Sequence, residues 1–263
     1  MGTVAEIAVT GRLEHFGYSG AHVMTELYCL EQRAADLPTA KNWLSRDEVV
    51  CLDRLRFEKR RSDWLLGRWT AKRAVALSLG LRELPADLSQ VEIRAEPSGA
   101  PAVFLLNRLA DPRQKATISL SHSCGRAVCV VVLREVALGC DIEKADPRSD
   151  AFVADYFTAE EQVTIARSAP KARARISTLI WSAKESALKA LHTGLRADTR
   201  SVSVTVTNRP ENSPGWSPLQ VLCAKGQTLR GWWRETEGFV LTIVSDSALI
   251  DQPALLEISG HHS

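Results

Sequence analysis

The order of the predicted secondary-structure elements constrains the fold of this chain more than any other feature of its sequence. Strands and helices occur in two successive batches, and this order is typical of two α+β lobes. At 263 residues the chain can form two small lobes, each with a hydrophobic core. We therefore expect an N-terminal lobe over 1–135, a C-terminal lobe over 136–250 and a loosely held tail over 251–263.

A β-hairpin is the clearest element of the first batch. The segments ATISLSHS and RAVCVVVL flank Cys124 and Gly125 and have the composition of strands. Because the second segment is apolar throughout, we expect it to lie in the middle of a sheet. The other predicted elements are a strand over 4–10 and helical segments over 22–35 and 46–79, the last with Gly80 as its C-cap and Pro85 beyond it.

The second batch begins with the strand-like segment ALGCDIE. Thr158 and Glu161 have the T-x-x-E spacing of a capping box and predict the start of a helix. A further helix contains IWSAKESALKA, residues 180–190. The segments SVSVTVT, LQVLCAK, LRGWW and FVLTIVS then predict an antiparallel meander, with the loop NRPENSPGWSP between two of its strands.

Composition narrows the class of protein. The net charge of +2 gives no reason to expect a nucleic-acid or membrane partner, so any anion site must be local. Six cysteines without a CxxC pair fit reduced thiols in the cytoplasm. The N-terminus lacks the apolar core of a signal peptide, and the longest charge-free apolar run, AVCVVVL, is too short to cross a bilayer. Walker, GxGxxG, HExxH and zinc-site spacings are absent, which argues against the commonest ATPases, dehydrogenases and zinc hydrolases.

The helix over 180–190 has an unusual outer face. Glu185 and Lys189 stand four residues apart, in the orientation that favours a salt bridge on a solvated helix surface. At about 100° per residue, Glu185 points away from the apolar stripe, yet Trp181 and Leu188 flank that outer face. We infer a second contact surface, while a plain surface pair remains the alternative. The apolar stripe consists of Ile176, Ile180, Ala183, Ala187 and Leu191.

Two carboxylates in the strand LGCDIEK are candidate metal ligands. Strand alternation places Asp141 and Glu143 on one face. Such a pair can converge on Mg²⁺, which takes a few carboxylate oxygens and leaves its other positions to water or phosphate. The alternative is a strand with one solvated polar face. A third carboxylate, such as Glu185, would favour the metal site.

Cationic side chains share one side of the helical segment RRSDWLLGRWTAKRA. Arg61, Arg68 and Lys72 stand at positions i, i+7 and i+11. Three aligned cations on a largely apolar helix suggest an anion such as a phosphate, and a solvated helix edge explains them equally well.

His122 ends the first strand of the hairpin, in SLSHSCG. An imidazole there can donate to a phosphate oxygen, or it can be an ordinary strand-end histidine. The neighbouring Ser119, Ser121 and Ser123 supply hydroxyl donors. A catalytic Ser-His pair needs a third partner that orients the imidazole, and the sequence shows none.

Taken together and in order, these segments resemble the phosphopantetheinyl transferases of the Sfp type. The family's G-x-D-x-E strand corresponds to 139–143, and its W/F-S-x-K-E-x-x-x-K helix corresponds to 181–189. Its S-x-S-H-S segment corresponds to 119–123, Gly67-Arg68 fits its "GR" helix, and DYFTAEE resembles its F-x-x-x-E segment. The resemblance extends from about Arg60 to Leu191. One departure is Gly99-Ala100-Pro101, where the family often has G-K-P with a lysine that meets the phosphates of the coenzyme.

The resemblance implies two similar α/β lobes related by a pseudo-two-fold axis, with coenzyme A in the cleft between them. It implies a monomer, because the shorter holo-acyl-carrier-protein synthases reach the same arrangement by trimerising single lobes. The implied reaction transfers 4′-phosphopantetheine from coenzyme A to a serine of an apo acyl or peptidyl carrier protein or carrier domain. It releases adenosine 3′,5′-bisphosphate and serves fatty-acid, polyketide or nonribosomal-peptide biosynthesis.

The resemblance also implies roles for individual residues. Mg²⁺ would be bound by Asp141, Glu143 and Glu185, and Glu185 would take the serine proton. Lys189 and His122 would stabilise charge on the pyrophosphate, while Trp181 and Leu188 would line the cleft. The residues expected to bind the coenzyme are Arg60, Arg61, Arg68, Lys72, Ser121, His122, Lys184 and Lys189.

Two other functions would use the same residues. A Mg²⁺-dependent phosphohydrolase would employ the same carboxylates with water as the acceptor. A non-catalytic module that binds coenzyme A or a nucleotide would need neither the metal nor Glu185. The carrier protein, the pathway and the tolerance for acylated coenzyme A stay open.

Overall fold

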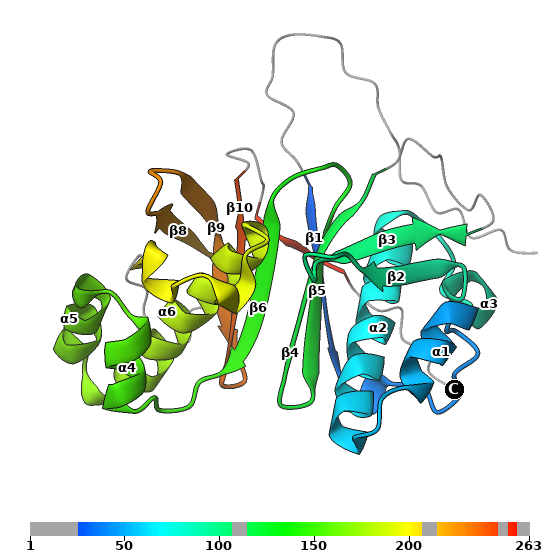
Figure 1. Cartoon of the computed structure of the whole chain (residues 1–263), viewed down its shortest axis with the longest axis horizontal. Helices are drawn as coiled ribbons and strands as arrows, with labels where there is room; N and C mark the ends of the chain where they lie inside the picture. Colours follow the sequence, from blue (N-terminus) through cyan, green and yellow to red (C-terminus); the bar gives the residue numbers. More distant parts are fainter. Residues whose placement is uncertain (1–25, 107–114, 207–214, 247–251, 257–263) are drawn as a thin grey trace, which may run out of the picture.

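Two β-sheets pack face to face in the computed structural model, which describes residues 26–106, 115–206, 215–246 and 252–256 (Figure 1). Helices cover the outer face of each sheet. The strands are β1 Leu27–Arg33, β2 Val91–Ala95, β3 Pro101–Leu105, β4 Thr117–Ser123, β5 Arg126–Val132, β6 Leu138–Lys144, β7 Val202–Val206, β8 Ser217–Cys223, β9 Thr228–Thr236, β10 Phe239–Ser245 and β11 Ala254–Leu255. The α-helices are α1 Arg46–Asp53, α2 Glu58–Ser78, α3 Pro85–Leu88, α4 Asp150–Tyr156, α5 Ala159–Arg167 and α6 Pro170–Ala190.

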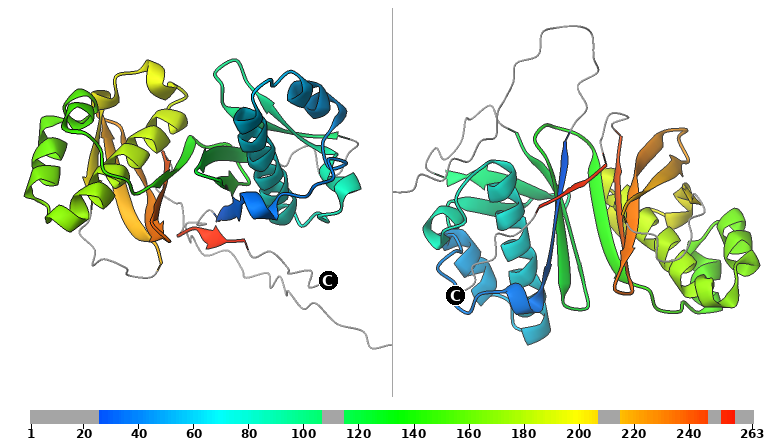
Figure 2. Two further views of the ribbon diagram at one scale, coloured as in Figure 1. Left: turned by 90° about the horizontal axis from the view of Figure 1, so that it is seen from below. Right: turned by 180° about the vertical axis from the view of Figure 1, so that it is seen from behind.

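The two lobes repeat one topology. The first sheet has the order β11-β1-β5-β4-β3-β2, and the second has the order β6-β10-β9-β8-β7. Apart from the added β11, each strand of one sheet therefore has a counterpart at the same place in the other. Each lobe also has one long helix of 21 residues, α2 or α6, and these helices lie on opposite outer sides (Figure 2). The repeat confirms the predicted fold of two similar α/β lobes.

Apolar side chains fill the layer between the two sheets. On each facing strand, alternate residues point into this layer, as the period of a strand requires. Cys29 of β1 and Val130 of β5 pack there against Cys140 and Ile142 of β6. Because β6 lies at the edge of its sheet, it also contacts β4 of the first lobe, and this contact creates the junction that carries the candidate site.

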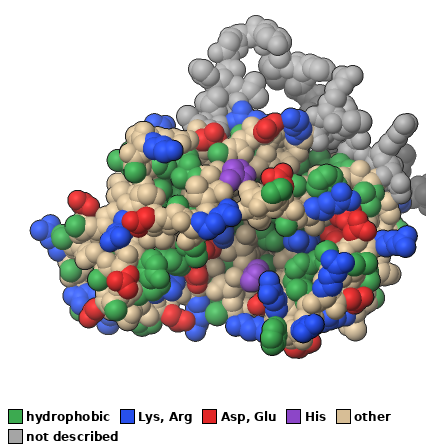
Figure 3. All heavy atoms as spheres, in the orientation of Figure 1, with side chains coloured by type: hydrophobic (Ala, Val, Ile, Leu, Met, Phe, Trp, Pro, Cys, Tyr) green, Lys and Arg blue, Asp and Glu red, His purple; other side chains and the backbone are tan. Residues whose placement is uncertain are grey.

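The surface is mixed in charge. Acidic and basic side chains alternate over the face in Figure 3, and neither sign forms a patch that covers a whole lobe. This mixture agrees with the small net charge of the chain. Among the described residues, no helix combines the length and the apolar character needed to cross a membrane.

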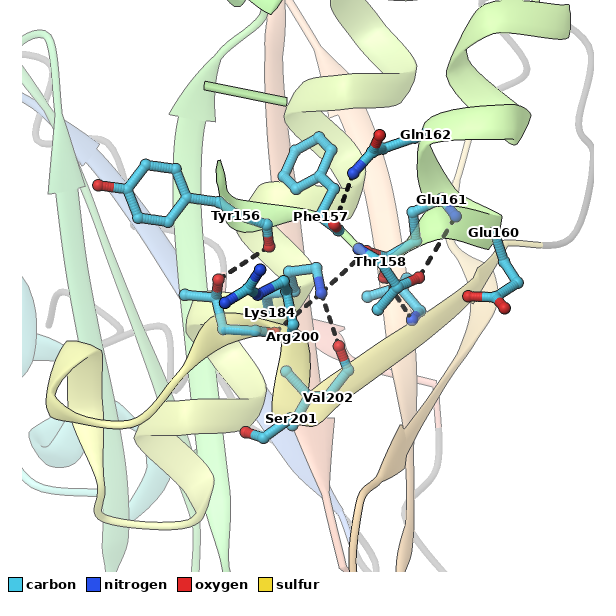
Figure 4. A network of polar contacts seen from close by, with 12 residues as sticks. Tyr156, Phe157, Thr158, Glu160, Glu161, Gln162, Lys184, Arg200, Ser201 and Val202 are labelled. Carbon is cyan, nitrogen blue, oxygen red and sulfur yellow. Dashed lines mark hydrogen bonds and ion pairs between the residues drawn. The ribbon is translucent and has the colours of Figure 1, made fainter. Parts of the chain in front are cut away.

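A buried ion pair anchors the long helix of the second lobe. Thr158 caps α5 and forms the predicted capping box with Glu161, which is confirmed. Glu161 in turn lies 2.8 Å from the ammonium of Lys184 on α6, and it accepts a hydrogen bond from the backbone N–H of Val204 at 2.8 Å. Lys184 also donates to the carbonyl of Val202 at 2.6 Å, so its charge is enclosed by oxygen atoms (Figure 4).

The first lobe contains the same arrangement. Ser45 caps α1 in a capping box with Glu48, and Glu48 pairs with Lys72 of α2. Glu48 also accepts a hydrogen bond from the backbone N–H of Ile93 at 3.1 Å. The side chains of Lys72 and Lys184 are both fully buried. A cap, a glutamate and a helix lysine therefore hold the long helix to the sheet in each lobe.

Two of the predicted helical segments need correction. The segment 22–35 is not an α-helix where it is described, since 27–33 forms β1 and pairs with β5 along its whole length, and only a short 3-10 turn, Ala34–Asp36, follows. Its residues are buried on both faces of the sheet, so their apolar pattern does not distinguish a strand from a helix. The predicted helix 46–79 is two helices, because the chain turns between Asp53 and Glu58.

The remaining predicted elements agree with the structure. The hairpin is β4 and β5, and β5 is buried at every position between β1 and β4. The meander is β7 to β10. The predicted strand 4–10 lies outside the described residues. Within the tail, Ala254 and Leu255 pair with β1 and extend the first sheet.

Candidate active site

Serine hydroxyls of β4 join the first lobe to β6 of the second. Because alternate residues of a strand share one face, the S-x-S-x-S spacing presents three hydroxyls to the same neighbour. The sequence suggested these serines as donors, and the structure gives each of them a partner on β6. The three bonds connect Ser119 Oγ with Cys140 N (2.9 Å), Ser121 Oγ with Asp141 Oδ1 (2.8 Å) and Ser123 Oγ with Glu143 Oε2 (3.4 Å).

Asp141 is the centre of this junction. Asp141 is buried, with only 2% of its surface exposed. Oδ1 accepts hydrogen bonds from Ser121 and from the Lys189 ammonium, the latter at 2.9 Å. Oδ2 is buried and has no hydrogen-bond partner within the described ranges. A buried carboxylate oxygen without a partner is costly, so Asp141 has one coordination position left for a donor or a cation.

Lys189 reaches this carboxylate from the last turn of α6. Its ammonium donates to the Cys140 carbonyl at 2.9 Å and to Ser121 Oγ at 3.1 Å, in addition to Asp141. Glu185, one turn earlier on the helix, lies 3.9 Å away. Burial by itself lowers the pKa of Lys189 and is the largest single effect, but the negative charges around the ammonium, that of Asp141 first, together outweigh it and the net shift is upward. Lys189 is therefore charged at neutral pH and surrounded by oxygen atoms.

Burial and neighbouring negative charges disfavour the ionised forms of the other two carboxylates, Glu143 and Glu185. Burial and the charge of Asp141 raise the pKa of Glu185 to about 7, although Lys189 opposes that shift. The pKa of Glu143 is also raised, by burial and then by Asp141, while Arg148 opposes the shift from 3.7 Å. Two acids whose ionisation is disfavoured in this way gain most from a cation placed beside them.

The donor set fits a hard divalent ion. Asp141, Glu143 and Glu185 offer only oxygen, which Mg²⁺ prefers, and Asp141 Oδ2 lacks another partner in the described part of the chain. Among the residues with described positions, however, no three His, Cys, Asp or Glu side chains have the geometry of a metal site as they stand. The predicted ligands are thus neighbours, and the Lys189 ammonium is the cation beside them.

A cavity of about 800 Å³ adjoins the cluster. It lies where β3 diverges from β4, since these strands pair only through Ala102 and Thr117. Its wall includes Ser119 and Lys189, so it opens beside Asp141. The equivalent strands of the second lobe, β8 and β9, pair over six residues from Ser217–Trp233 to Leu222–Thr228 without a comparable gap. Ala100, where the family often has lysine, also lines the cavity.

Two predicted coenzyme ligands are instead structural. Lys72 is enclosed by Glu48 and the carbonyl of Trp43, to which it donates at 2.8 Å. Lys184 is enclosed by Glu161 and two backbone carbonyls. Neither side chain has any exposed area, so neither can contact a ligand in the cavity. The predictions for both lysines are wrong, because the helix faces that carry them turn towards the other helices of each lobe.

The arginines of α2 have different environments. Arg61 donates to the carbonyls of Leu52 and Leu55 at 2.7 and 3.0 Å, which stabilises the turn between α1 and α2. Arg60 is exposed. Arg68 is partly buried with its guanidinium 5.0 Å from the ring centre of Trp64, and burial lowers its pKa. Its Nε is buried and has no hydrogen-bond partner in the described segments, so Arg68 has donor capacity to spare.

His122 does not join the carboxylate cluster. It is exposed and lies between Ser121 and Ser123 on β4, so its side chain projects from the opposite face of the strand. That face is the one covered by α2, since Leu120 lies against Gly67. A role for His122 at the pyrophosphate beside Asp141 is therefore not supported, whereas His122 and α2 share a side of the sheet.

The outer face of α6 is buried rather than open. Trp181 is 7% exposed and packs against Phe152 and Tyr156, with ring centres 4.8 and 5.4 Å apart. Leu188 is 1% exposed in the core of the second lobe. The inference of a second contact surface is confirmed, but the prediction that these two residues line the cleft is wrong.

Two important residues escaped the sequence reasoning. Gly139 lies against α6 so closely that a β-carbon would meet the Ser186 carbonyl oxygen at 1.8 Å, so no other residue fits there. Arg148 lies 3.7 Å from Glu143 and stacks over Phe152, with 5.0 Å between guanidinium carbon and ring centre. The glycine of the G-x-D-x-E strand was a signal for the first, and no sequence pattern indicated the second.

A family comparison agrees with this geometry. Residues 137–244 match the model of the 4′-phosphopantetheinyl transferase superfamily. The matched stretch contains β6, α6 and the meander, and hence Asp141, Glu143, Glu185 and Lys189. The match confirms the predicted resemblance and the predicted enzyme class at the level of the superfamily. The Sfp-type subfamily stays a prediction.

The three relatives named here each correspond to less than half of the chain. The holo-[acyl-carrier-protein] synthase of Streptococcus agalactiae serotype III (strain NEM316) is 29% identical over 113 residues, 43% of this chain and 87% of that relative. A crystal structure of Helicobacter pylori holo-[acyl-carrier-protein] synthase in complex with coenzyme A has 21% identity, 41% and 99% coverage of the two chains and a TM-score of 0.35. The Bacillus anthracis str. Ames synthase in complex with CoA (3′,5′-ADP) has 20% identity, 42% and 97% coverage and a TM-score of 0.36.

Proposed function

We propose that this protein, whose residues 137–244 match the 4′-phosphopantetheinyl transferase superfamily, transfers 4′-phosphopantetheine from coenzyme A to a serine of an apo acyl or peptidyl carrier protein. The reaction releases adenosine 3′,5′-bisphosphate. The observation that carries the proposal is the cluster of Asp141, Glu185 and Lys189 at the wall of a cavity between the lobes. We further propose that the enzyme acts as a monomer, because one chain already contains two lobes. We place it in the cytoplasm, where its six cysteines would stay reduced.

The cavity between β3 and β4 is suited to part of the coenzyme. Its volume of about 800 Å³ lies within the range usual for small-molecule sites. Lys189 lines the cavity and also contacts Asp141, so an ammonium and carboxylates meet at its edge. A pyrophosphate placed at that edge has a cation on one side and the proposed metal ligands on the other.

Asp141, Glu143 and Glu185 would hold Mg²⁺, and the bound ion would neutralise charge on the pyrophosphate. Phosphoryl transfer depends mainly on positioning and on charge stabilisation, which is the work of the surrounding donors. Ser121 and Lys189 orient Asp141 through their bonds to Oδ1. Lys189 stabilises the negative charge that develops on the leaving phosphate.

Glu185 is the proposed general base. Its carboxylate lies beside Asp141 and Lys189, and without a bound ion burial and the charge of Asp141 raise its pKa to about 7. A bound cation would favour the ionised form, which is the form that accepts a proton. Its side chain is 20% exposed, so an incoming serine hydroxyl can approach it directly or through a water molecule. The serine oxygen then attacks the phosphorus, and the bond to the bisphosphate leaving group breaks.

The 3′-phosphate of the coenzyme would be recognised by side chains on the α2 side of β4. Arg68 has an unpartnered Nε within the described ranges, and His122 and Arg60 are exposed on the same lobe. Ala100 supplies no charge, so these donors carry more of the recognition than they would if a lysine stood at that position. Ser121, which was also predicted to bind the coenzyme, would act at the pyrophosphate instead, by orienting Asp141 through its hydrogen bond.

A single experiment tests the function. The protein is incubated with coenzyme A, Mg²⁺ and a panel of apo carrier proteins, and the mass of each carrier is measured. A carrier that gains one phosphopantetheine on its serine supports the proposal. Cleavage of coenzyme A without any carrier indicates a phosphohydrolase instead. Binding of coenzyme A without cleavage or transfer on any carrier indicates a non-catalytic module.

A further inference from the structure

Lys189 has the surroundings of a bound cation. Its ammonium lies 2.9 Å from Asp141 Oδ1, 2.9 Å from the Cys140 carbonyl, 3.1 Å from Ser121 Oγ and 3.9 Å from Glu185 Oε2. All four neighbours are oxygen atoms, and two of them belong to proposed metal ligands. Without any ligand, the ammonium is thus already neutralised and hydrogen-bonded inside the carboxylate cluster.

The ammonium and a divalent ion compete for the same carboxylates. Asp141 already gives Oδ1 to Lys189, and Glu185 is the next nearest anion to the same ammonium. An ion bound by both acids would place two further positive charges within a few ångströms of Nζ. Like charges at such a separation repel strongly in a poorly solvated site. The ion therefore binds well only when Lys189 moves away or finds another anion.

The neighbouring cavity offers the lysine a second position. Lys189 lines the cavity wall as well as the cluster. The other described cation of the wall, Lys115, is paired with Glu135 at 2.7 Å. An anion that enters the cavity can therefore pair with Lys189. The carboxylates that Lys189 leaves are then free to bind a metal ion. Lysine is suited to such a transfer because its ammonium is a compact charge on a flexible stem.

We propose that Lys189 is a tethered counter-cation that occupies the carboxylate cluster until a divalent ion and a diphosphate bind together. The diphosphate draws the ammonium into the cavity, and the ion takes the carboxylates that it leaves. Binding of the two ligands is then coupled, and the coupling is reciprocal, since each ligand must raise the affinity for the other by the same factor. The inference rests on the proposed function, because that function supplies both ligands.

The probe is Mn²⁺, whose free form is counted by electron paramagnetic resonance, titrated into the full chain. Lys189→Met should bind Mn²⁺ alone about tenfold more tightly than the wild type, because the competitor is gone. Coenzyme A should tighten Mn²⁺ binding in the wild type by more than it does in Lys189→Met, again by about tenfold, within the usual range for coupled sites. Adenosine 3′,5′-bisphosphate, which lacks the diphosphate, should give little enhancement in either protein.

Arg148→Met is the matched control. It removes one positive charge 3.7 Å from Glu143 without freeing Asp141. If both variants tighten Mn²⁺ binding equally, the effect is general electrostatics and the inference is overturned. Unchanged Mn²⁺ affinity in Lys189→Met overturns it as well.

Coenzyme A titrations of the wild-type protein keep the inference testable should Lys189→Met fail to fold. An equal enhancement by coenzyme A and by the bisphosphate would then count against it. Failure of the proposed function is a separate result, because it is measured as the absence of phosphopantetheine on every carrier.

Discussion

Gly139 of β6 and Ser186 of α6 are in direct backbone contact. A β-carbon on Gly139 would stand 1.8 Å from the Ser186 carbonyl oxygen and 2.8 Å from the backbone nitrogen of Ala190. In the first lobe, β1 and α2 are the counterparts of these elements, and α2 packs mainly over β5 instead. The close approach of α6 to β6 brings Glu185 and Lys189 within reach of Asp141.

Gly139→Ala should therefore damage both stability and activity. The methyl group cannot be accommodated without moving α6, because the atoms it meets are backbone. We expect a loss of about 3 kcal/mol or more in the free energy of unfolding, at the upper end for overpacking. Urea denaturation measures it. Gly67→Ala in α2 is the control, since its methyl group would meet only the end of the Leu120 side chain at 3.2 Å, and its effect should stay within about 1 kcal/mol.

Lys184→Met should destabilise the protein without changing its affinity for coenzyme A. The change leaves Glu161 buried without its cation, which typically costs about 3–5 kcal/mol. Lys72→Met should cost a similar amount, because it breaks the equivalent pair with Glu48. Lys184→Met/Glu161→Gln should recover part of the loss, because it removes the uncompensated charge and keeps an oxygen that can accept one of the two backbone hydrogen bonds of Glu161. Denaturation curves and calorimetric titration with coenzyme A check both parts, and weakened coenzyme binding by correctly folded Lys184→Met would restore the original assignment of Lys184 as a ligand.

Glu185→Gln should change the pH dependence of stability. Burial and Asp141 raise the pKa of Glu185 to about 7 in the folded protein, so its protonated form is favoured there. The stability linked to this group is fully present below its unfolded pKa and is lost as pH rises through 7. Without added metal, Glu185→Gln should be more stable than wild type at pH 8, by at most about 3 kcal/mol, with little difference at pH 4.

The control for this shift is Glu160→Gln. Hydrogen bonds from its own backbone N–H and from Thr158 lower the pKa of Glu160, so its carboxylate stabilises the fold above its unfolded pKa. Glu160→Gln should thus be less stable than wild type at pH 8, the opposite sign. Unfolding curves at the two pH values test both variants, and a Glu185→Gln difference that is independent of pH would contradict the raised pKa.

Arg68→Ala should remove the preference for the 3′-phosphate of coenzyme A. A charge-assisted contact to phosphate contributes roughly 1.5–3 kcal/mol, so binding of coenzyme A should weaken about ten- to a hundred-fold. Dephospho-coenzyme A, which lacks that phosphate, should bind equally to both proteins. Arg61→Ala should lower stability and keep the preference, because Arg61 caps the turn after α1. Calorimetric titrations decide, and an unchanged preference in Arg68→Ala would place the 3′-phosphate elsewhere.

Local patterns in the sequence predicted the elements that depend on near neighbours. The Thr158–Glu161 capping box and the hairpin turn at Cys124-Gly125 are complete within a few residues. Strand alternation likewise placed Asp141 and Glu143 on β6, because the period of a strand does not depend on its partners. The two lobes were predicted from the order of these locally predicted elements, because strands and helices occur in two successive batches.

Local patterns failed where packing between distant segments decides. The apolar residues of 27–33 fit a strand or a helix, and only pairing with β5 makes them a strand. Lys72 and Lys184 have the charge of a phosphate ligand, but each is buried against a glutamate more than twenty residues earlier in the chain.

The sequence alone thus determined which acids and which lysine are candidates for catalysis, because these residue types and their spacings occur within one strand, Leu138–Lys144, and one helix, Pro170–Ala190. Only the tertiary structure decided that Asp141 meets Ser121 of the other lobe and that His122 turns away from both. It also decided that Lys189 lies in the cluster while Lys184, five residues earlier, does not. The physical reason is that burial and partner are set by the two sheets and by the depth at which α6 packs on β6, which no local pattern specifies.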